Sequence, residues 1–209
     1  MADQDAAPSP EEMLRLIEEQ QAAAMRRFVP DPRLMYVPWG VAWFIGFGTL
    51  FLGQGLAGDG SGPLPITWQA GLAVLWGTQI IAFVLMVIAL LRSGGHIKGQ
   101  SETRGAMYGL AWFVGFNAMG VIGARFSALL PSEMIGPFYT ALFMFVAGLL
   151  YMAGGAVYRL WPQFLLGVWV VALDVAGTVL GGGWIYLLLA VLGGGGAVAT
   201  GLWLRWRQG

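Results

Sequence analysis

The sequence predicts an all-α, polytopic membrane protein, with a bundle of six transmembrane helices in three hairpins that follows an amphipathic helix. Of its 209 residues, 57% are apolar and only 11% are charged, and the mean hydropathy is +0.69. A soluble domain carries about 25% charged residues. Six apolar runs each reach the roughly 20 residues that a helix needs to cross about 30 Å of hydrocarbon. We expect residues 1–33 to form a cytoplasmic tail and residues 34–209 a single membrane domain.

The composition also excludes several classes of function. Lys and Arg number 11, as do Asp and Glu, so no excess of basic charge is present to bind nucleic acid. The chain has no cysteine, which excludes disulfides, thiolate catalysis and cysteine-based metal sites. The lipid bilayer is therefore the one partner that the composition itself implies, and we expect no cofactor. The oligomeric state is left open.

The first predicted helix lies in the polar N-terminal segment. Ser9 is placed as its N-cap, Pro10 as its first residue, and Glu12 as the side chain that reaches back to the cap. Apolar residues recur at helical spacing along one face: Met13, Leu16, Ile17, Ala24 and Phe28. We expect Pro30 and Pro32 to end this helix. It either packs under its own bundle, lies on the membrane face, or docks a partner protein through residues 9–28.

Six apolar runs follow, separated by short polar or glycine-rich loops. Loops this short make neighbouring helices antiparallel, which gives three hairpins. Because no apolar run lies near Met1, we expect insertion to depend on the first span. The predicted spans are 35–56, 67–91, 105–128, 135–158, 162–180 and 183–204.

Basic residues fall on one side of the membrane if there are six spans. Ten of the 11 precede the first span, flank the even-numbered loops or follow the last span, and Arg125 alone lies toward the other side. The positive-inside rule places such residues in the cytoplasm. We therefore expect both termini to be cytoplasmic.

Two of the predicted spans have closely similar sequences. Residues 38–51 read PWGVAWFIGFGTLF and residues 107–120 read MYGLAWFVGFNAMG, so Trp43 aligns with Trp112 and Gly48 with Asn117. A weaker third copy around Trp169 places Asp174 at the same position. Because the first, third and fifth spans run in one direction, the match predicts parallel repeats about an axis along the membrane normal. Chance similarity between apolar, glycine-rich helices is the alternative.

Four polar side chains inside the predicted spans are the most informative: Gln79, Asn117, Arg125 and Asp174. A charged Asp in a membrane helix costs roughly 2.5–3.5 kcal/mol, so Asp174 needs a cationic partner or a proton. Arg125 and Asp174 lie at equal depth, which makes an ion pair geometrically feasible. The pair either ties the third span to the fifth, or lines with Asn117 a polar pocket open to the outside, or does not form. These four are our candidate ligand or ion-pathway residues.

The glycine-rich loop at 94–101 resembles a phosphate-binding loop only superficially. Gln100 stands where the phosphate-contacting lysine is required, and no strand precedes the loop. His96, the single histidine, is interpreted as a solvated loop residue, because Glu102 alone could join it on a metal. We find no nucleophile–base pair and no carboxylate pair facing one cavity, so we predict no enzymatic activity and no metal site.

Three features together resemble an uncharacterised family of six-helix actinobacterial membrane proteins. They are the motif RG-MYG-AW-GF between Arg104 and Phe116, the run YMAGGAVYR at 151–159, and the acidic N-terminal helix. The resemblance covers most of the chain. It implies a bacterial plasma membrane location and supplies no catalytic residues.

Two classes of function follow from these observations. The first is a small transporter, channel or small-molecule-binding protein that uses the polar intramembrane residues. The alternative is a non-enzymatic accessory or regulatory subunit that binds a partner membrane protein through its N-terminal helix. A polar cavity continuous with solvent favours the first class, and a dry bundle with an exposed apolar stripe at 13–28 favours the second.

Overall fold

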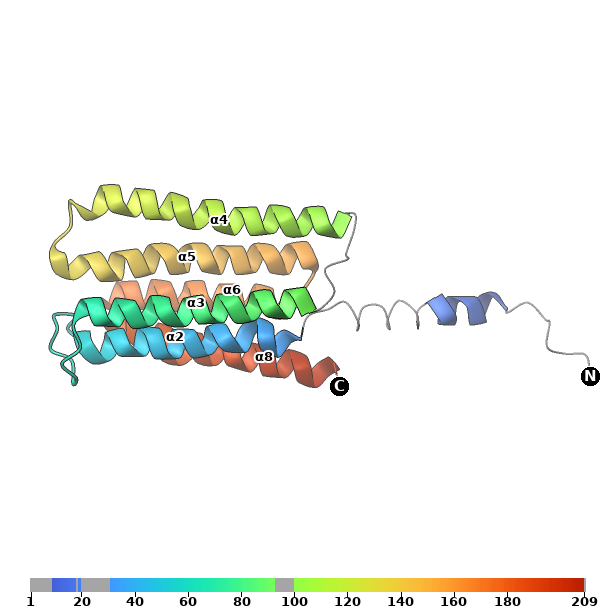
Figure 1. The fold of residues 1–209 in the computed structure, drawn as a ribbon, viewed down its shortest axis with the longest axis horizontal. Coiled ribbons are helices and arrows are strands. Elements are labelled where there is room, and N and C mark those ends of the chain that lie inside the picture. The colour runs from blue at the N-terminus through green and yellow to red at the C-terminus, as the bar shows by residue number, and fades with distance from the viewer. Residues whose placement is uncertain (1–8, 18, 20–30, 93–99, 209) are drawn as a thin grey trace, which may run out of the picture.

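The computed structural model describes residues 9–17, 19, 31–92 and 100–208, and the regular secondary structure of these residues is helical. Six helices are long and apolar enough to cross a membrane, which confirms the predicted fold class. They lie side by side in one bundle (Figure 1). The elements are α2 (Pro32–Gln54), α3 (Trp68–Arg92), α4 (Gln100–Ser127), α5 (Ser132–Tyr158), α6 (Trp161–Leu180), and a final continuous run of α7 (Trp184–Leu188), η1 (Leu189–Gly193) and α8 (Gly194–Gln208).

The N-terminal helix begins as the sequence predicts. The Ser9 backbone N–H donates to Glu12 Oε2 at 2.9 Å, and the Glu12 backbone N–H donates to Ser9 Oγ at 3.2 Å. This reciprocal pair is a capping box, and residues 10–17 are helical. Met13, Leu16 and Ile17 are each about half exposed, at 49%, 49% and 51%. Most of the predicted helix after Ile17 lies outside the described residues.

Helix α2 begins at Pro32, which we expected to end the preceding helix. Proline suits a first helical position, where its missing N–H has no helical partner to lose. Asp31 is the N-cap, and its Oδ1 accepts a hydrogen bond from the Arg33 backbone N–H at 2.9 Å. The Arg33 side chain also donates to Asp31, at 2.9 Å for the closer pair of atoms, and this bond lowers the pKa of the Asp31 carboxyl. Where the preceding helix ends lies outside the described residues, so its end at Pro30 and Pro32 stays a prediction.

The helices are arranged as an open series, α3–α2–α8–α6–α5–α4, in which each packs against its neighbours. Helices α2 and α6 lie inside the series, and 39% of the most apolar 18-residue window of each is buried. Helices α3 and α4 lie at its two ends, where only 11% and 0% of the corresponding windows are buried. Within the described residues, the α3 backbone approaches only α2 and the α4 backbone approaches only α5. Figure 1 shows α4 along one outer edge of the bundle, beside α5.

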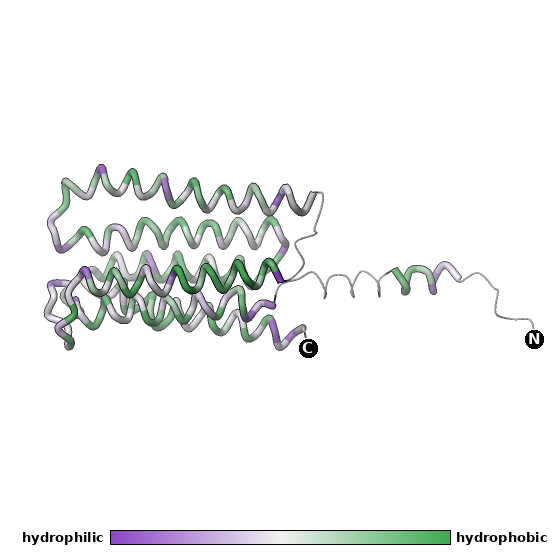
Figure 2. Tube along the Cα trace, viewed as in Figure 1, coloured by the Kyte–Doolittle hydropathy of each residue, from purple (hydrophilic) through white to green (hydrophobic). Residues whose placement is uncertain are grey.

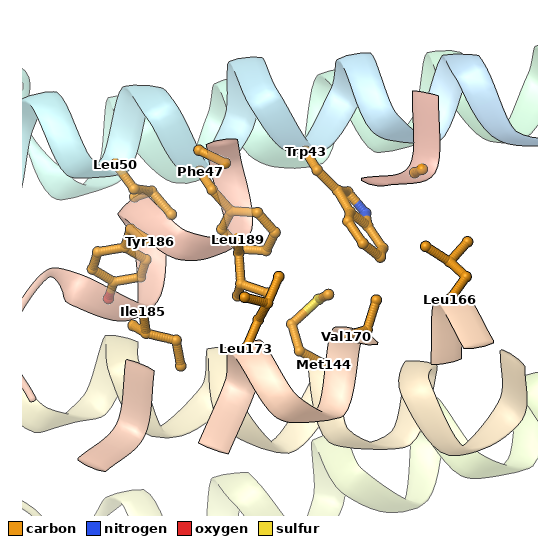
Figure 3. Close-up of a cluster of buried hydrophobic side chains, with 12 residues drawn as sticks. Trp43, Phe47, Leu50, Met144, Leu166, Val170, Leu173, Ile185, Tyr186 and Leu189 are labelled. Atoms are coloured by element: carbon orange, nitrogen blue, oxygen red, sulfur yellow. The ribbon is translucent and has the colours of Figure 1, made fainter. Parts of the chain in front are cut away.

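The core is an apolar cluster between α2 on one side and α5, α6 and the last helical run on the other (Figure 3). Val170 and Leu189 are 0% exposed, and Ile185 and Tyr186 are 1% exposed. The other side chains of the cluster are also buried, each at most 5% exposed. The cluster comprises Trp43, Phe47, Leu50, Met144, Leu166, Val170, Leu173, Ile185, Tyr186, Leu189, Ala190 and Ala197.

Small residues allow α2 and α8 to pack closely. A Cβ placed on Gly40 would lie 2.6 Å from the backbone oxygen of Gly194, so neither position tolerates a side chain without a shift. Close backbone approach at glycine is a common way of packing membrane helices. The π-helical segment η1 immediately precedes Gly194. The sequence did not predict this segment.

The arginines confirm the sorting that six antiparallel spans require. Helix starts and ends at one end of the bundle carry Arg33, Arg92, Arg104, Arg159, Arg205 and Arg207, and we call this the basic end. Arg125 lies near the last residue of α4, Ser127, at the opposite end. Which end faces the cytoplasm stays a prediction.

The two similar hairpins pack differently against the rest of the bundle. Trp43 in α2 is 3% exposed, whereas the aligned Trp112 in α4 is only half-buried. Both indole rings nevertheless meet the same side chain edge-on, with centroids 6.4 Å (Trp43) and 5.5 Å (Trp112) from the ring of Tyr151. An internal duplication stays a prediction.

Candidate functional site

Asp174 is the most deeply buried of the four predicted site residues. It lies on α6 and is 3% exposed, and its Oδ1 has no hydrogen-bond partner. On the same face of α6, Gly177 packs against the backbone of Ile185. A carboxylate buried without a cation is costly. A neutral, protonated carboxyl is therefore the form that fits this place in the core.

The sequence left open whether Arg125 and Asp174 form an ion pair, and in the structure these two described residues do not. Arg125 is exposed on α4 and Asp174 is buried on α6. Among the described residues the salt bridges are Arg15–Glu19 and Arg33–Asp31. Equal depth along the membrane normal does not determine whether two helices are neighbours in the plane of the membrane. Helix α5 packs against both α4 and α6 and separates them laterally.

Asn117 lies on the exposed surface of α4. Its Nδ2 donates a hydrogen bond to the backbone oxygen of Phe113 at 2.8 Å. Its Oδ1 accepts no hydrogen bond from the described residues. Gln79 is half-buried on α3, and its Oε1 is a buried atom without a partner. The four candidate residues therefore lie on three different helices and do not converge on one cavity.

Two hollows on the surface of the bundle are apolar, and the four candidate residues do not line them. One groove, of about 710 Å³, runs along α6 between Val168 and Leu180. A second hollow, of about 310 Å³, lies between α2 and the last helical run, over Gly48. Neither is lined by Gln79, Asn117, Arg125 or Asp174. These hollows suit apolar groups such as lipid chains rather than ions.

A polar chain that the sequence did not reveal joins four helices near the basic end. Tyr36 Oη on α2 donates to Gln163 Oε1 on α6 at 3.3 Å. Gln163 Nε2 donates to Tyr108 Oη on α4 at 3.2 Å. Tyr108 Oη donates in turn to the backbone oxygen of Leu150 on α5 at 2.8 Å. Gln163 is only 9% exposed, so its amide depends on these partners.

Sequence reasoning missed this chain because its members lie near helix ends. Gln163 is the third residue of α6, and Tyr36 is the fifth of α2. Polar and aromatic residues at such positions resemble interfacial anchors. One signal could have predicted the chain. Tyr36, Tyr108 and Gln163 lie at similar distances from the basic end, each on a different one of the three hairpins.

The Tyr186 hydroxyl is, like Asp174 Oδ1, a buried polar atom without a partner, and both lie toward the end of the bundle opposite the basic end. Tyr186 is 1% exposed, and its hydroxyl has no hydrogen-bond partner. This hydroxyl lies over Gly136 of α5, where a Cβ would come within 2.6 Å of it. Asp174 and Tyr186 are thus two core side chains whose polar atoms are unsatisfied among the described residues. Figure 3 shows the Tyr186 ring next to Leu50, with its hydroxyl at the end of the ring that is farther from Leu50.

The described residues contain no group of three or more His, Cys, Asp and Glu side chains that could hold a metal. His96 lies outside the described residues. Within the described part, some intramembrane polar side chains bond one another, as Tyr36, Tyr108 and Gln163 do. Others bond backbone oxygens, as Asn117 and Thr78 do, and the Tyr186 hydroxyl has no partner.

Comparisons with protein-family models, with curated proteins and with solved structures give no match. Membership of the six-helix family that the motifs resemble therefore stays a prediction. The six apolar helices show a multi-pass membrane protein, by length and hydropathy.

Proposed function

We propose that this protein is a non-enzymatic membrane assembly subunit that binds another transmembrane helix through the exposed surface of α4. One observation carries this proposal. The α4 span, Thr103–Ser127, has the lowest mean hydropathy of the six, 1.3, and 0% of its most apolar 18-residue window is buried. The α2 span, at 1.4, is 39% buried. A weakly apolar helix is the one expected to seek a protein neighbour rather than lipid.

The contrast with α3 strengthens this argument. Helix α3 is also exposed, with 11% of its window buried, but its mean hydropathy is 2.5. Its exposed side chains include Ile80, Ile81 and Leu91, which lipid tails solvate well. Figure 2 shows α3 as the more uniformly hydrophobic of the two helices. Lipid therefore suits the exposed surface of α3 better than that of α4, and for this reason we assign the protein neighbour to α4.

The N-terminal helix supplies a second surface for such a partner. Its described apolar residues Met13, Leu16 and Ile17 share one face, because they are spaced by three or four positions. All three are exposed. Arg15 and Glu19 form an ion pair of 3.1 Å on another face. A partner held at α4 and at residues 9–28 would be contacted both inside and beside the membrane.

Lipid-phase photolabelling tests the proposal without altering the chain. A membrane-dissolved diazirine reagent is activated in native membranes, and the labelled peptides are quantified by mass spectrometry. We expect strong labelling of α3 between Trp76 and Leu91, and weak labelling of the exposed face of α4 between Met107 and Ala124. Equal labelling of the two helices would mean that lipid covers α4 and that the assembly function is wrong.

A second candidate function rests on Asp174. An ionisable side chain buried in a membrane helix is a functional-site hypothesis by default, and Asp174 has no structural partner that explains it. A proton or cation pathway through the bundle would use this carboxyl. Purified protein in vesicles with an internal pH-sensitive dye tests it: flux above empty vesicles that is lost in Asp174→Asn supports a pathway. Flux equal to that of empty vesicles contradicts it.

A further inference from the structure

The face of α4 that packs against α5 is aromatic. Tyr108, Trp112 and Phe116 follow one another at intervals of four residues, which places them on one side of the helix. The Trp112 ring lies 5.5 Å from Tyr151, and the Phe116 ring stacks 5.5 Å from Phe143. This single face attaches α4 to the bundle. The opposite side of the helix is left without a helical neighbour in the described chain.

That opposite side carries a regular stripe. Its members are separated alternately by three and four residues, which is the 3.5-residue period of two helices packed along a common seam. Four of them are among the more exposed apolar side chains of the protein, at 67%, 60%, 55% and 72% for Met107, Leu110, Val114 and Val121. Asn117 and Ala124 are also exposed. We call this set the α4 stripe: Met107, Leu110, Val114, Asn117, Val121 and Ala124.

Asn117 occupies the middle of the α4 stripe. Its Nδ2 is bonded to Phe113 within the helix, but its Oδ1 accepts nothing from the described residues. Lipid tails offer no donor to this oxygen. Asn side chains in the contact surfaces of membrane helices hydrogen-bond across to the facing helix. The position of Asn117 therefore points to a facing helix with a polar group at the same depth.

We propose that the facing helix is α4 of a second copy of this chain, which makes the protein a parallel, two-fold symmetric dimer about the α4 stripe. This inference rests on the proposed assembly function and names its partner. Two copies share one orientation in the membrane, so a two-fold axis along the membrane normal sets each stripe residue beside itself. The amide of Asn117 both donates and accepts, and it therefore complements the Asn117 amide of the second copy without a further group.

The remaining residues of α4 are compatible with this geometry. Val114 and Val121 are the stripe residues before and after Asn117, so they would flank the two Asn117 amides of the dimer. Both are β-branched, as is common in the contact surface of two-stranded coiled coils. Arg125 lies beside the stripe and two residues before the end of α4, where its guanidinium reaches the aqueous boundary. No charge is placed in the seam itself.

Single-cysteine cross-linking tests the dimer directly, because the chain has no cysteine to remove. Val114→Cys and Val121→Cys lie on the stripe. Val84→Cys on α3 and Val179→Cys on α6 are matched controls, since these valines are 48% and 80% exposed. In purified full-length protein in lipid vesicles, mild oxidation is expected to give disulfide-linked dimers of the two stripe variants only. Absence of stripe dimers, or equal dimers from the controls, overturns the proposal.

Asn117→Leu tests the role of the amide, and Gln79→Leu on α3 is its control. Fluorescence energy transfer between labelled copies, measured over a range of protein-to-lipid ratios, gives the dimer dissociation constant. We expect Asn117→Leu to raise this constant about 3- to 30-fold, the effect of losing an interhelical hydrogen bond in a membrane. Gln79→Leu is expected to leave it unchanged. A rise for Gln79→Leu as large as that for Asn117→Leu, or no rise for either, overturns the amide pairing.

The two tests separate this inference from the proposed function. Purified protein that stays monomeric, while the α4 stripe is protected from photolabelling in native membranes, means that a different protein covers the stripe and that the dimer is wrong. Strong photolabelling of the stripe in native membranes removes both proposals together.

Discussion

Gln163 and Tyr108 lie 55 residues apart in the sequence and are joined by a hydrogen bond of 3.2 Å from Gln163 Nε2 to Tyr108 Oη. This bond is the contact through which α4, otherwise packed on α5, reaches α6. The same Tyr108 hydroxyl donates to Leu150 at 2.8 Å, so one oxygen serves two helices. The basic end of α4 is thereby fixed, while the exposed stripe on its other side stays available.

The double role of the Tyr108 hydroxyl predicts its effect on stability. Tyr108→Phe keeps the ring contacts with Trp112 and Tyr158 but leaves the buried Gln163 amide and the Leu150 carbonyl without this partner. We expect a loss of roughly 1–3 kcal/mol in the free energy of unfolding, the cost of unsatisfied buried polar groups. Thermal and denaturant unfolding in detergent or nanodiscs measures it.

Two further tyrosines serve as controls for this change. Tyr36→Phe removes one longer bond, of 3.3 Å, and should cost less. Tyr139→Phe removes only a marginal contact of 3.5 Å with Ser127 and should be close to neutral. A loss for Tyr36→Phe as large as that for Tyr108→Phe would show that the chain is not centred on Tyr108.

Two glycines of α2 allow a matched test of the α2–α8 packing. Gly48 has open space where a Cβ would lie, whereas a Cβ on Gly40 would lie 2.6 Å from Gly194 O and 2.9 Å from Val198 N. Gly48→Ala should be neutral or stabilise by up to about 1 kcal/mol, because alanine favours helix. Gly40→Ala should destabilise by roughly 1–3 kcal/mol, because backbone atoms must move. Equal unfolding temperatures for the two variants would contradict the close approach of α2 and α8.

The fold could be predicted from the sequence because its signals are one-dimensional. A membrane fixes how long and how apolar each helix must be, and Ser9 and Glu12 carry their capping box within four residues. The sequence also placed the arginines at one end of the bundle, since antiparallel connections determine which helix ends meet. Positions along the membrane normal were therefore well predicted.

Lateral neighbours could not be predicted in the same way. Arg125 and Asp174 lie at equal depth, yet α5 separates their helices, and nothing in the spacing of the two residues records that order. The bond between Gln163 and Tyr108 was missed for the same reason. Choosing among the arrangements of six helices requires knowledge of which faces pack, and in a membrane the exposed and buried faces are both apolar.

The separation of Arg125 from Asp174 predicts that the two side chains are energetically independent. Arg125→Leu changes an exposed residue and should alter the unfolding free energy by no more than about 0.5 kcal/mol. Asp174→Leu removes an unsatisfied acceptor from the core and should stabilise the protein by roughly 1–3 kcal/mol. The double variant should equal the sum of the singles within about 0.5 kcal/mol. Strong recovery in the double variant, of about 3–5 kcal/mol, is expected only of a buried ion pair.

The last prediction concerns which end of the bundle faces the cytoplasm. Six spans place both chain ends on one side, and the described arginines other than Arg125 on the helices of the bundle gather at that basic end. Because basic loops are retained in the cytoplasm during insertion, reporter fusions after Gly95 and Gly209 should read inside, and fusions after Gly60 and Ser132 outside. Replacing Arg92 and Arg104 with glutamine should weaken this orientation, whereas Arg125→Gln should leave it unchanged or strengthen it. An outside signal from the Gly209 fusion would contradict the orientation if the Gly95 fusion also read outside. If the Gly95 fusion read inside, the same signal would contradict the six-helix topology. Four spans lie between Gly95 and Gly209 in that topology, so both fusions must read on the same side.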